Sequence, residues 1–194
     1  MQAVRKCAPL SLSLSAERVR DEVEKTLLSA SPQTVTEMAE LGLLKAVGVT
    51  GAEDLSFAAK LPPERSVRWA AFFRACPRAK WEDFRLERKT GEIAAKSAAL
   101  AASDAEPDWK RLISRYGTDV GLCTARLLGA EQTVREILDA GHCLFLKDLA
   151  VSGRDFPELK GREVGNMLQK LLEHVLKHPW DNVKEILLDL SRKL

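Results

Sequence analysis

Apolar residues recur every three to four positions from one end of this chain to the other, and runs that alternate apolar and polar residues are nearly absent. The first spacing matches the 3.6-residue turn of an α-helix, whereas a half-buried strand needs strict alternation. Residues 15–29, for example, place Val19, Val23, Thr26 and Leu27 on one face of a single helix. The sequence therefore predicts an all-α fold built from many helices.

Proline and glycine mark the predicted ends of these helices. Ser31-Pro32 is typical of an N-cap followed by proline at the first helical position, and Gly42 suits the stop of the same helix. Pro107 and Gly117 bound another predicted helix in the same way. No repeat recurs at a fixed period, so a regular solenoid is not expected.

Composition and charge set few limits on function. The chain has 194 residues, of which 45% are hydrophobic and 30% charged, as is typical of folded globular proteins. Thirty Lys and Arg stand against 28 Asp and Glu, so the formal net charge is +2. This small excess does not point to nucleic acid by itself. Nucleic-acid binding stays open, because cations and anions can be sorted onto opposite faces.

The four cysteines indicate a reducing compartment. Cys7, Cys76, Cys123 and Cys143 are far apart and form no C-x-x-C pair, which argues against a zinc knuckle and against a secreted disulfide scaffold. We expect a cytoplasmic protein in which each thiol is a small buried apolar group. No apolar run approaches the ~20 residues of a membrane span, so we expect no membrane partner.

Side chains that could carry catalysis or hold a metal are sparse. His174 and His178 lie four residues apart on one helix face, but the glutamate of H-E-x-x-H is missing. Histidines that face solvent or the C-terminal dipole of their helix are the alternative that we favour. The sequence also lacks G-x-S-x-G and G-x-x-x-x-G-K. We assign no catalytic and no metal-binding residue.

One short stretch could bind an anion: KGREVG, residues 160–165. Gly161 can open a helix whose free N–H groups point outwards, with Lys160 and Arg162 beside them. The alternative, which the local pattern favours, is a helix-entry glycine flanked by two solvated cations.

The N-terminal stretch RKCAPLSLSLSAERVRDEVEKTLLSASPQTVTEMAELGLL, residues 5–44, resembles the neck of bacterial tRNA nucleotidyltransferases. These are the CCA-adding enzymes, grouped with bacterial poly(A) polymerases. In that family a segment ending near CAPL leads into an S-x-E-R-x-x-x-E helix and then a P…L…LGLL helix. The matching positions of the first helix are Ser15, Glu17, Arg18 and Glu22.

Further segments agree with the family in the same order. RWAAFF, residues 68–73, is similar to its body helix, and the closing helix matches DNVKEILLDL, residues 181–190. Residues 149–179 resemble its tail signature, with matching positions at Ser152, Gly153, Asp155, Gly161, Gly165 and Leu168. The resemblance thus extends along almost the whole chain.

The departures concern the catalytic head of the family. Its G-S-x-x-R phosphate motif and paired metal-binding aspartates do not occur, and EDFR at 82–85 has neither the place nor the spacing of the base-selecting E-D-x-x-R. Phosphoryl transfer needs such carboxylates to hold two metal ions. At FFRACP, residues 72–77, many relatives carry a His-Asp pair, but this segment contains neither histidine nor a carboxylate. The chain thus resembles the part that follows the head.

The resemblance implies an elongated arrangement of a helical neck, body and tail, over residues 1–48, 49–140 and 141–194. It implies the tRNA-binding portion of an enzyme that adds C, C and A to tRNA 3′ ends. The head would supply the nucleotidyl transfer with Mg²⁺ and CTP or ATP, and we expect no cofactor in this chain. The implied partners are the acceptor and T arms of tRNA and the head itself.

Two groups of site residues follow from the resemblance. The neck motif would brace the neck against the head, with a simple solvated face as the alternative; its residues are Glu17, Arg18 and Glu22. Five cations within 24 residues of the tail suit phosphate oxygens rather than base edges, and they are Arg154, Lys160, Arg162, Lys170 and Lys177. A stand-alone helical interaction or regulatory protein without transferase activity remains the other possible function.

Overall fold

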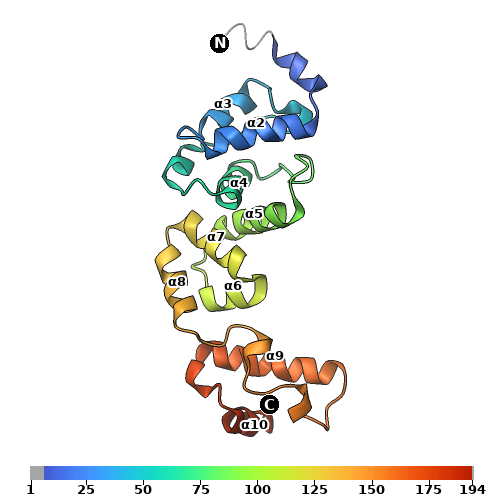
Figure 1. Ribbon diagram of the computed structural model, residues 1–194, viewed down its shortest axis with the longest axis vertical. Coiled ribbons are helices and arrows are strands. Elements are labelled where there is room, and N and C mark those ends of the chain that lie inside the picture. Colours follow the sequence, from blue (N-terminus) through green and yellow to red (C-terminus); the bar gives the residue numbers. More distant parts are fainter. Residues whose placement is uncertain (1–6, 194) are drawn as a thin grey trace. The chain divides into compact units, whose positions relative to one another are not determined.

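The structure, a computed structural model, describes residues 7–193 (Figure 1). Within this range the chain forms helices joined by turns and loops, and it contains no strand. The predicted all-α class is therefore confirmed. No helix in this range combines the length and apolar composition that crossing a lipid bilayer requires.

The chain divides into two compact units that are interleaved in sequence. Unit 1 comprises residues 1–106 and 119–131, and unit 2 comprises residues 107–118 and 132–194. The division into neck, body and tail refers to the family architecture and stays a prediction.

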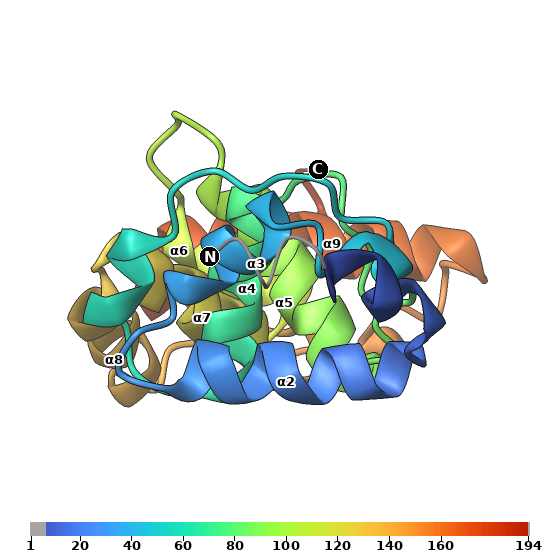
Figure 2. The same cartoon turned by 90° about the horizontal axis from the view of Figure 1, so that it is seen from above.

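Unit 1 contains five α-helices and three 3₁₀ helices. They are η1 (Ala8–Ser13), α2 (Ala16–Leu28), α3 (Thr34–Glu40), η2 (Lys45–Val47), η3 (Ser56–Lys60), α4 (Arg65–Ala75), α5 (Arg88–Ala101) and α7 (Thr118–Leu128). Helix α4 packs against both α2 and α5. Figure 2 shows α2 along its full length.

Helix α2 forms where its apolar spacing predicts it. The Ser15 hydroxyl accepts a hydrogen bond from Arg18 N at 3.4 Å, which caps one of the free N–H groups at the helix start. Val19, Val23 and Leu27 are buried, as their common face requires. The next helix, α3, begins at Thr34 rather than directly after Ser31. The N–H groups of Thr34 and Val35 bond three residues back, so Pro32 sits in a tight turn before the α-helix.

The core of unit 1 forms around α4, which is buried on almost every side. Four aromatic rings meet there, with neighbouring centroids 5.1–6.4 Å apart: Trp69, Phe72, Phe73 and Phe84. Helix α5 approaches this region through Gly91, because a Cβ atom there would lie 2.5 Å from the Trp81 ring. The glycine thus makes room for an indole against the helix backbone.

Unit 2 contains four α-helices and three 3₁₀ helices. They are α6 (Trp109–Tyr116), α8 (Glu131–Asp139), η4 (Leu146–Asp148), η5 (Gly153–Asp155), α9 (Arg162–Lys177), η6 (Pro179–Asp181) and α10 (Lys184–Ser191). Its buried residues include Ile113 of α6, Val134 of α8, Leu171 and Val175 of α9, and Leu187 of α10. Helix α6 therefore contributes to the same compact unit as the C-terminal helices.

The expectation that every thiol is buried is wrong for one cysteine. Cys76, Cys123 and Cys143 are buried, but Cys7 is exposed. Cys7 directly precedes the short helix η1, whose two leucines, Leu10 and Leu12, are also exposed. Burial raises the pKa of Cys76 to about 12 and those of Cys123 and Cys143 to about 11, so these three thiols stay protonated at neutral pH.

Candidate nucleic-acid interface

The three residues of the neck motif lie exposed on α2 and form no ion pair with one another. Glu22 instead pairs with Lys25, whose Nζ lies 2.7 Å from its Oε1. Hydrogen bonds from its own backbone N–H and from the Ser15 hydroxyl lower the pKa of Glu17. Within residues 7–193 the Arg18 side chain has no hydrogen-bonding or ionic partner. Arg18 is thus available to a molecule outside the chain.

The carboxylate of α2 that does tie helices together is Glu24, which our sequence analysis did not single out. Its Oε2 accepts hydrogen bonds from Arg65 Nε at 2.7 Å and from Trp69 Nε1 at 2.8 Å. Both partners belong to α4, so Glu24 links α2 to the core helix. The only sequence signal was its place beside Val23, on the edge of the apolar face.

The segment Ser152-Gly153-Arg154-Asp155 forms a hydrogen-bonded turn before α9. The Asp155 carboxylate accepts a hydrogen bond from Ser152 N at 2.8 Å, and the Ser152 hydroxyl accepts one from Arg154 N at 3.4 Å. The other Asp155 oxygen lies 2.5 Å from Lys184 Nζ, at the start of α10. These contacts, with Lys184 as the largest cause, hold the pKa of Asp155 down at about 2.

This turn brings three of the five predicted tail cations to one end of α9. Gly153 packs so closely on the first turn of α9 that an added Cβ would lie 2.9 Å from Val164 Cγ1. Arg154 therefore lies beside the segment that carries Lys160 and Arg162. Gly161, with φ +53°, is the N-cap residue between these two cations, as the sequence predicted.

All five tail cations are exposed, but a carboxylate shares their site. Glu163 Oε2 accepts a hydrogen bond from Lys160 N at 3.4 Å, so an acidic side chain folds back over the residue that precedes the N-cap of α9. Lys170 and Lys177 are seven residues apart in α9 and share one face of that helix.

The charge of the two units differs. Counted from the sequence, unit 2 holds 13 Lys and Arg against 11 Asp and Glu, and unit 1 holds 17 of each. The net charge of +2 therefore falls on unit 2.

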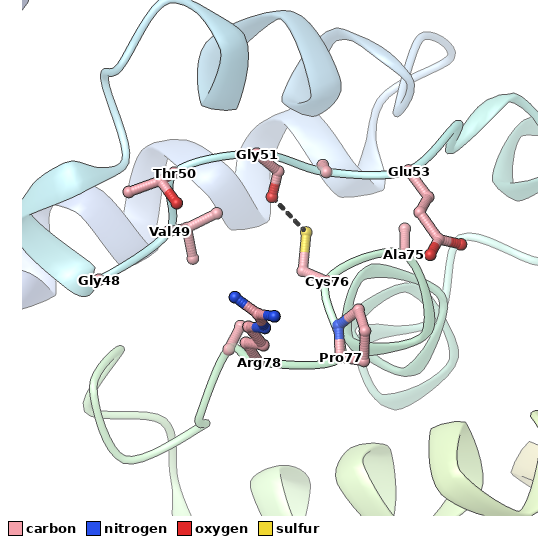
Figure 3. A pocket seen from close by; sticks show the side chains of 11 residues that line it. Gly48, Val49, Thr50, Gly51, Glu53, Ala75, Cys76, Pro77 and Arg78 are labelled. Carbon is pink, nitrogen blue, oxygen red and sulfur yellow. Dashed lines mark hydrogen bonds between the residues drawn. The ribbon is translucent and has the colours of Figure 1, made fainter.

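A small pocket in unit 1 contains a thiol but no chemistry to activate it (Figure 3). It lies between the loop of residues 48–53 and the turn of residues 75–79, with a volume of about 220 Å³. Cys76 Sγ lies 3.8 Å from the Gly51 carbonyl oxygen, to which it donates. Because its pKa is raised to about 12, Cys76 is a poor nucleophile, and the pocket does not favour covalent catalysis.

The histidine pair of α9 makes local contacts. His174 Nε2 lies 2.6 Å from Asp181 Oδ2, and the rings of His174 and His178 lie 4.7 Å apart. Across residues 7–193, His, Cys, Asp and Glu side chains form no group of three or more that could hold a metal ion. The arrangement as a whole offers exposed cations on a helical scaffold.

Comparison with known proteins finds similarity to one protein family and to CCA-adding enzymes. Residues 1–47 match the protein family described as "Probable RNA and SrmB- binding site of polymerase A". The CCA-adding enzyme of Bacillus velezensis is 26% identical over 193 residues, which cover 90% of this chain and 49% of that enzyme.

A solved structure shares the fold. The crystal structure of the Bacillus stearothermophilus CCA-adding enzyme in complex with CTP is similar with a TM-score of 0.79 and 23% identity, over 99% of this chain and 56% of that one. The chain thus spans about half the length of the relatives it matches. The resemblance read from the residues is confirmed.

Proposed function

Because the chain is homologous to the RNA-binding region of the CCA-adding enzyme and poly(A) polymerase family, we propose that it is the tRNA-binding helical portion of a tRNA nucleotidyltransferase. In this proposal the chain holds the acceptor and T arms of tRNA while CCA is added to the 3′ end. A helical surface that presents cations to phosphates suits shape-based recognition of A-form RNA.

The observation that carries the proposal is the match to an RNA-binding family over residues 1–47, continued by similarity to a CCA-adding enzyme along 90% of the chain. The exposed cations of the tail and the net positive charge of unit 2 support it. Phosphate contacts supply most of the sequence-independent affinity of such proteins, as an enzyme that serves every tRNA requires.

We assign the transfer chemistry to a separate catalytic head, together with its Mg²⁺ and its CTP or ATP. Three exposed leucines beside the neck motif support a protein partner there: Leu10 is 70% exposed, Leu12 58% and Leu14 43%. Apolar side chains exposed together commonly mark an interaction surface. The unpaired Arg18 lies in the helix that follows. The free state of the four cysteines agrees with a cytoplasmic location.

Binding and activity are tested together on the 194-residue chain. A fluorescently labelled tRNA without its 3′ CCA is titrated with the chain at low salt, beside an acceptor–T-arm minihelix and an anticodon hairpin. We expect the chain to bind the tRNA and the minihelix more tightly than the hairpin. The affinity should fall steeply as salt is added, because counterions are released on binding.

The same chain is then incubated with the truncated tRNA, Mg²⁺, CTP and ATP. We expect no 3′ extension above a control without protein. Extension by the isolated chain would contradict the placement of the chemistry in a separate head. If neither tRNA nor minihelix binds, a stand-alone helical interaction protein becomes the better description.

A further inference from the structure

We propose that a groove between α6 and α9 of unit 2 is a second RNA contact, in which one strand of tRNA lays its backbone against two arginines. This inference rests on the proposed function and assigns it residues outside the tail loop. Helix α6 contributes Arg111, Ser114 and Arg115 to the groove, and α9 contributes Gln169, Leu172 and Glu173. Its volume is about 630 Å³. Figure 1 labels both helices.

The two arginines project from the same face of α6. Arg111 and Arg115 are four residues apart, so they are neighbours on the helix surface, with Cβ atoms about 5–6 Å apart. Each guanidinium can donate two parallel hydrogen bonds to two oxygens of one phosphate. Two such groups at this separation can hold successive phosphates of one strand.

Only Arg111 already has an ionic partner. Its Nη2 lies 2.9 Å from Glu173 Oε2, across the groove, and its Nε lies 3.7 Å from Asp108 Oδ2, at the start of the same helix. Arg115 forms no ion pair within residues 7–193; its guanidinium lies 5.3 Å from the centroid of the Tyr116 ring. The groove thus holds two cations against one carboxylate.

Three other cavities among the described residues have a net negative charge or none. One in unit 1 is lined by three carboxylates and two cations, and another by two carboxylates and one cation. The pocket of Figure 3 has one of each. Among these four, the α6–α9 groove is the one whose lining favours an anion.

The rest of the lining favours a nucleotide over a bare anion. Leu146 is 43% exposed at the groove, where its apolar surface can pack against a ribose or a base. The Ser114 hydroxyl and the Gln169 amide can donate to sugar or phosphate oxygens, as such side chains do in nucleic-acid complexes. Inorganic phosphate would use the arginines and leave Leu146 in water.

The test compares charge removal inside and outside the groove. Arg111→Gln/Arg115→Gln is titrated with labelled tRNA lacking CCA at several salt concentrations. The matched control is Lys110→Gln, which removes a charge from the same helix but does not line the groove. We expect the double variant to raise the Kd at least about tenfold and to reduce the slope of log K against log salt by about one per lost contact. The control should change Kd less than about twofold.

Glu173→Gln should change the Kd for tRNA in the opposite direction to the double variant. Removing this carboxylate leaves Arg111 with the more distant Asp108 contact and lowers the negative charge of the groove, so tRNA should bind more tightly. On adding unlabelled tRNA, the Gln169 side-chain amide and the Leu146 methyls should shift in NMR spectra of the wild type. Unchanged circular dichroism spectra would show that each variant is folded.

Three outcomes overturn the inference. If wild-type chain binds tRNA and the double variant equals the Lys110→Gln control, the groove is not a contact, while the proposed function stands. If the wild type does not bind tRNA, both fail. If a labelled polyglutamate peptide binds in a way that depends on Arg111 and Arg115, and does not compete with tRNA, the groove takes an acidic protein segment instead.

Discussion

Glu24 and Trp69 are joined by a hydrogen bond of 2.8 Å between the carboxylate of an outer helix and the indole N–H of a fully buried core residue. The same carboxylate oxygen also accepts a hydrogen bond from Arg65 Nε at 2.7 Å. One side chain of α2 therefore satisfies the single polar atom that the Trp69 ring brings into the core. An indole N–H left without a partner there would cost free energy.

Removing this carboxylate should destabilise the protein. We expect Glu24→Ala to lower the free energy of unfolding by about 1–3 kcal/mol, because it leaves the Trp69 N–H without its acceptor. Glu22→Ala is the matched control, since it removes an exposed pair of the same helix that should contribute about 0–1 kcal/mol. Urea denaturation followed by tryptophan fluorescence measures both. Equal losses in the two variants would contradict the role given to Glu24.

Two glycines inside helices should respond with opposite sign to replacement by alanine. Gly91→Ala places a Cβ 2.5 Å from the rigid Trp81 ring and should cost about 1–3 kcal/mol through overpacking. Gly165 has nothing within 4 Å of its added Cβ, so Gly165→Ala should stabilise α9 by up to about 1 kcal/mol. Thermal and urea melts compare the two. Stabilisation by Gly91→Ala would show that Trp81 moves freely.

Substitutions of Arg18 and Arg68 should have very different effects on stability, because one side chain is exposed and the other is buried. Arg68 is 4% exposed and donates to the Leu27, Leu61 and Pro62 carbonyls at 2.9–3.0 Å, so Arg68→Met should cost about 2–4 kcal/mol by leaving these carbonyls without their donor. Arg18 is exposed and unpaired within residues 7–193, and Arg18→Ala should change stability by less than about 1 kcal/mol.

The same Arg18→Ala change should lower nucleotide addition when the chain is joined to a catalytic head. A large melting shift of the isolated Arg18→Ala chain would instead assign Arg18 to holding the fold.

Asp155 should titrate well below an ordinary aspartate. Its pKa is held at about 2, against a usual 3.8, chiefly by Lys184. Because the folded pKa is depressed, the stabilising contribution is complete above pH ~4 and is lost as the pH falls from there through about 2. An NMR titration of the Asp155 carboxyl carbon should give a midpoint near 2, and Lys184→Met should move it upwards. A wild-type midpoint near 3.8 would mean that the contact does not persist in solution.

The tail loop should contribute to tRNA binding without specificity. Changing Lys160 and Arg162 together to Ala should weaken binding of every tRNA alike and flatten the salt dependence by about one unit per lost contact. Their exposure predicts little effect on folding. Arg192→Ala/Lys193→Ala, two cations after α10, is the control. If affinity and salt slope both stay at the wild-type values, tRNA does not contact this loop.

The sequence by itself determined where the helices lie and which faces they bury. Val19, Val23 and Leu27 are buried on α2 because helical periodicity is a property of neighbouring residues and can be read along the chain. Gly161 is the N-cap of α9 for an equally local reason: its φ of +53° is easily reached by glycine. The start of α3 was misplaced because a proline turn and a first helical turn share the same residue types.

The tertiary structure decided which charged residues act together. Apart from its place on the edge of the apolar face, nothing in the sequence of α2 sets Glu24 apart from Glu17 or Glu22, and only the approach of α4 gives it partners. Likewise α6 precedes α7 in sequence but belongs to unit 2, where Arg111 meets Glu173, 62 positions further along the chain. Contacts between distant residues depend on how the helices pack, because packing is set by the shapes of helix surfaces and not by the order of the helices along the chain. A charge pattern alone therefore could not predict the α6–α9 groove.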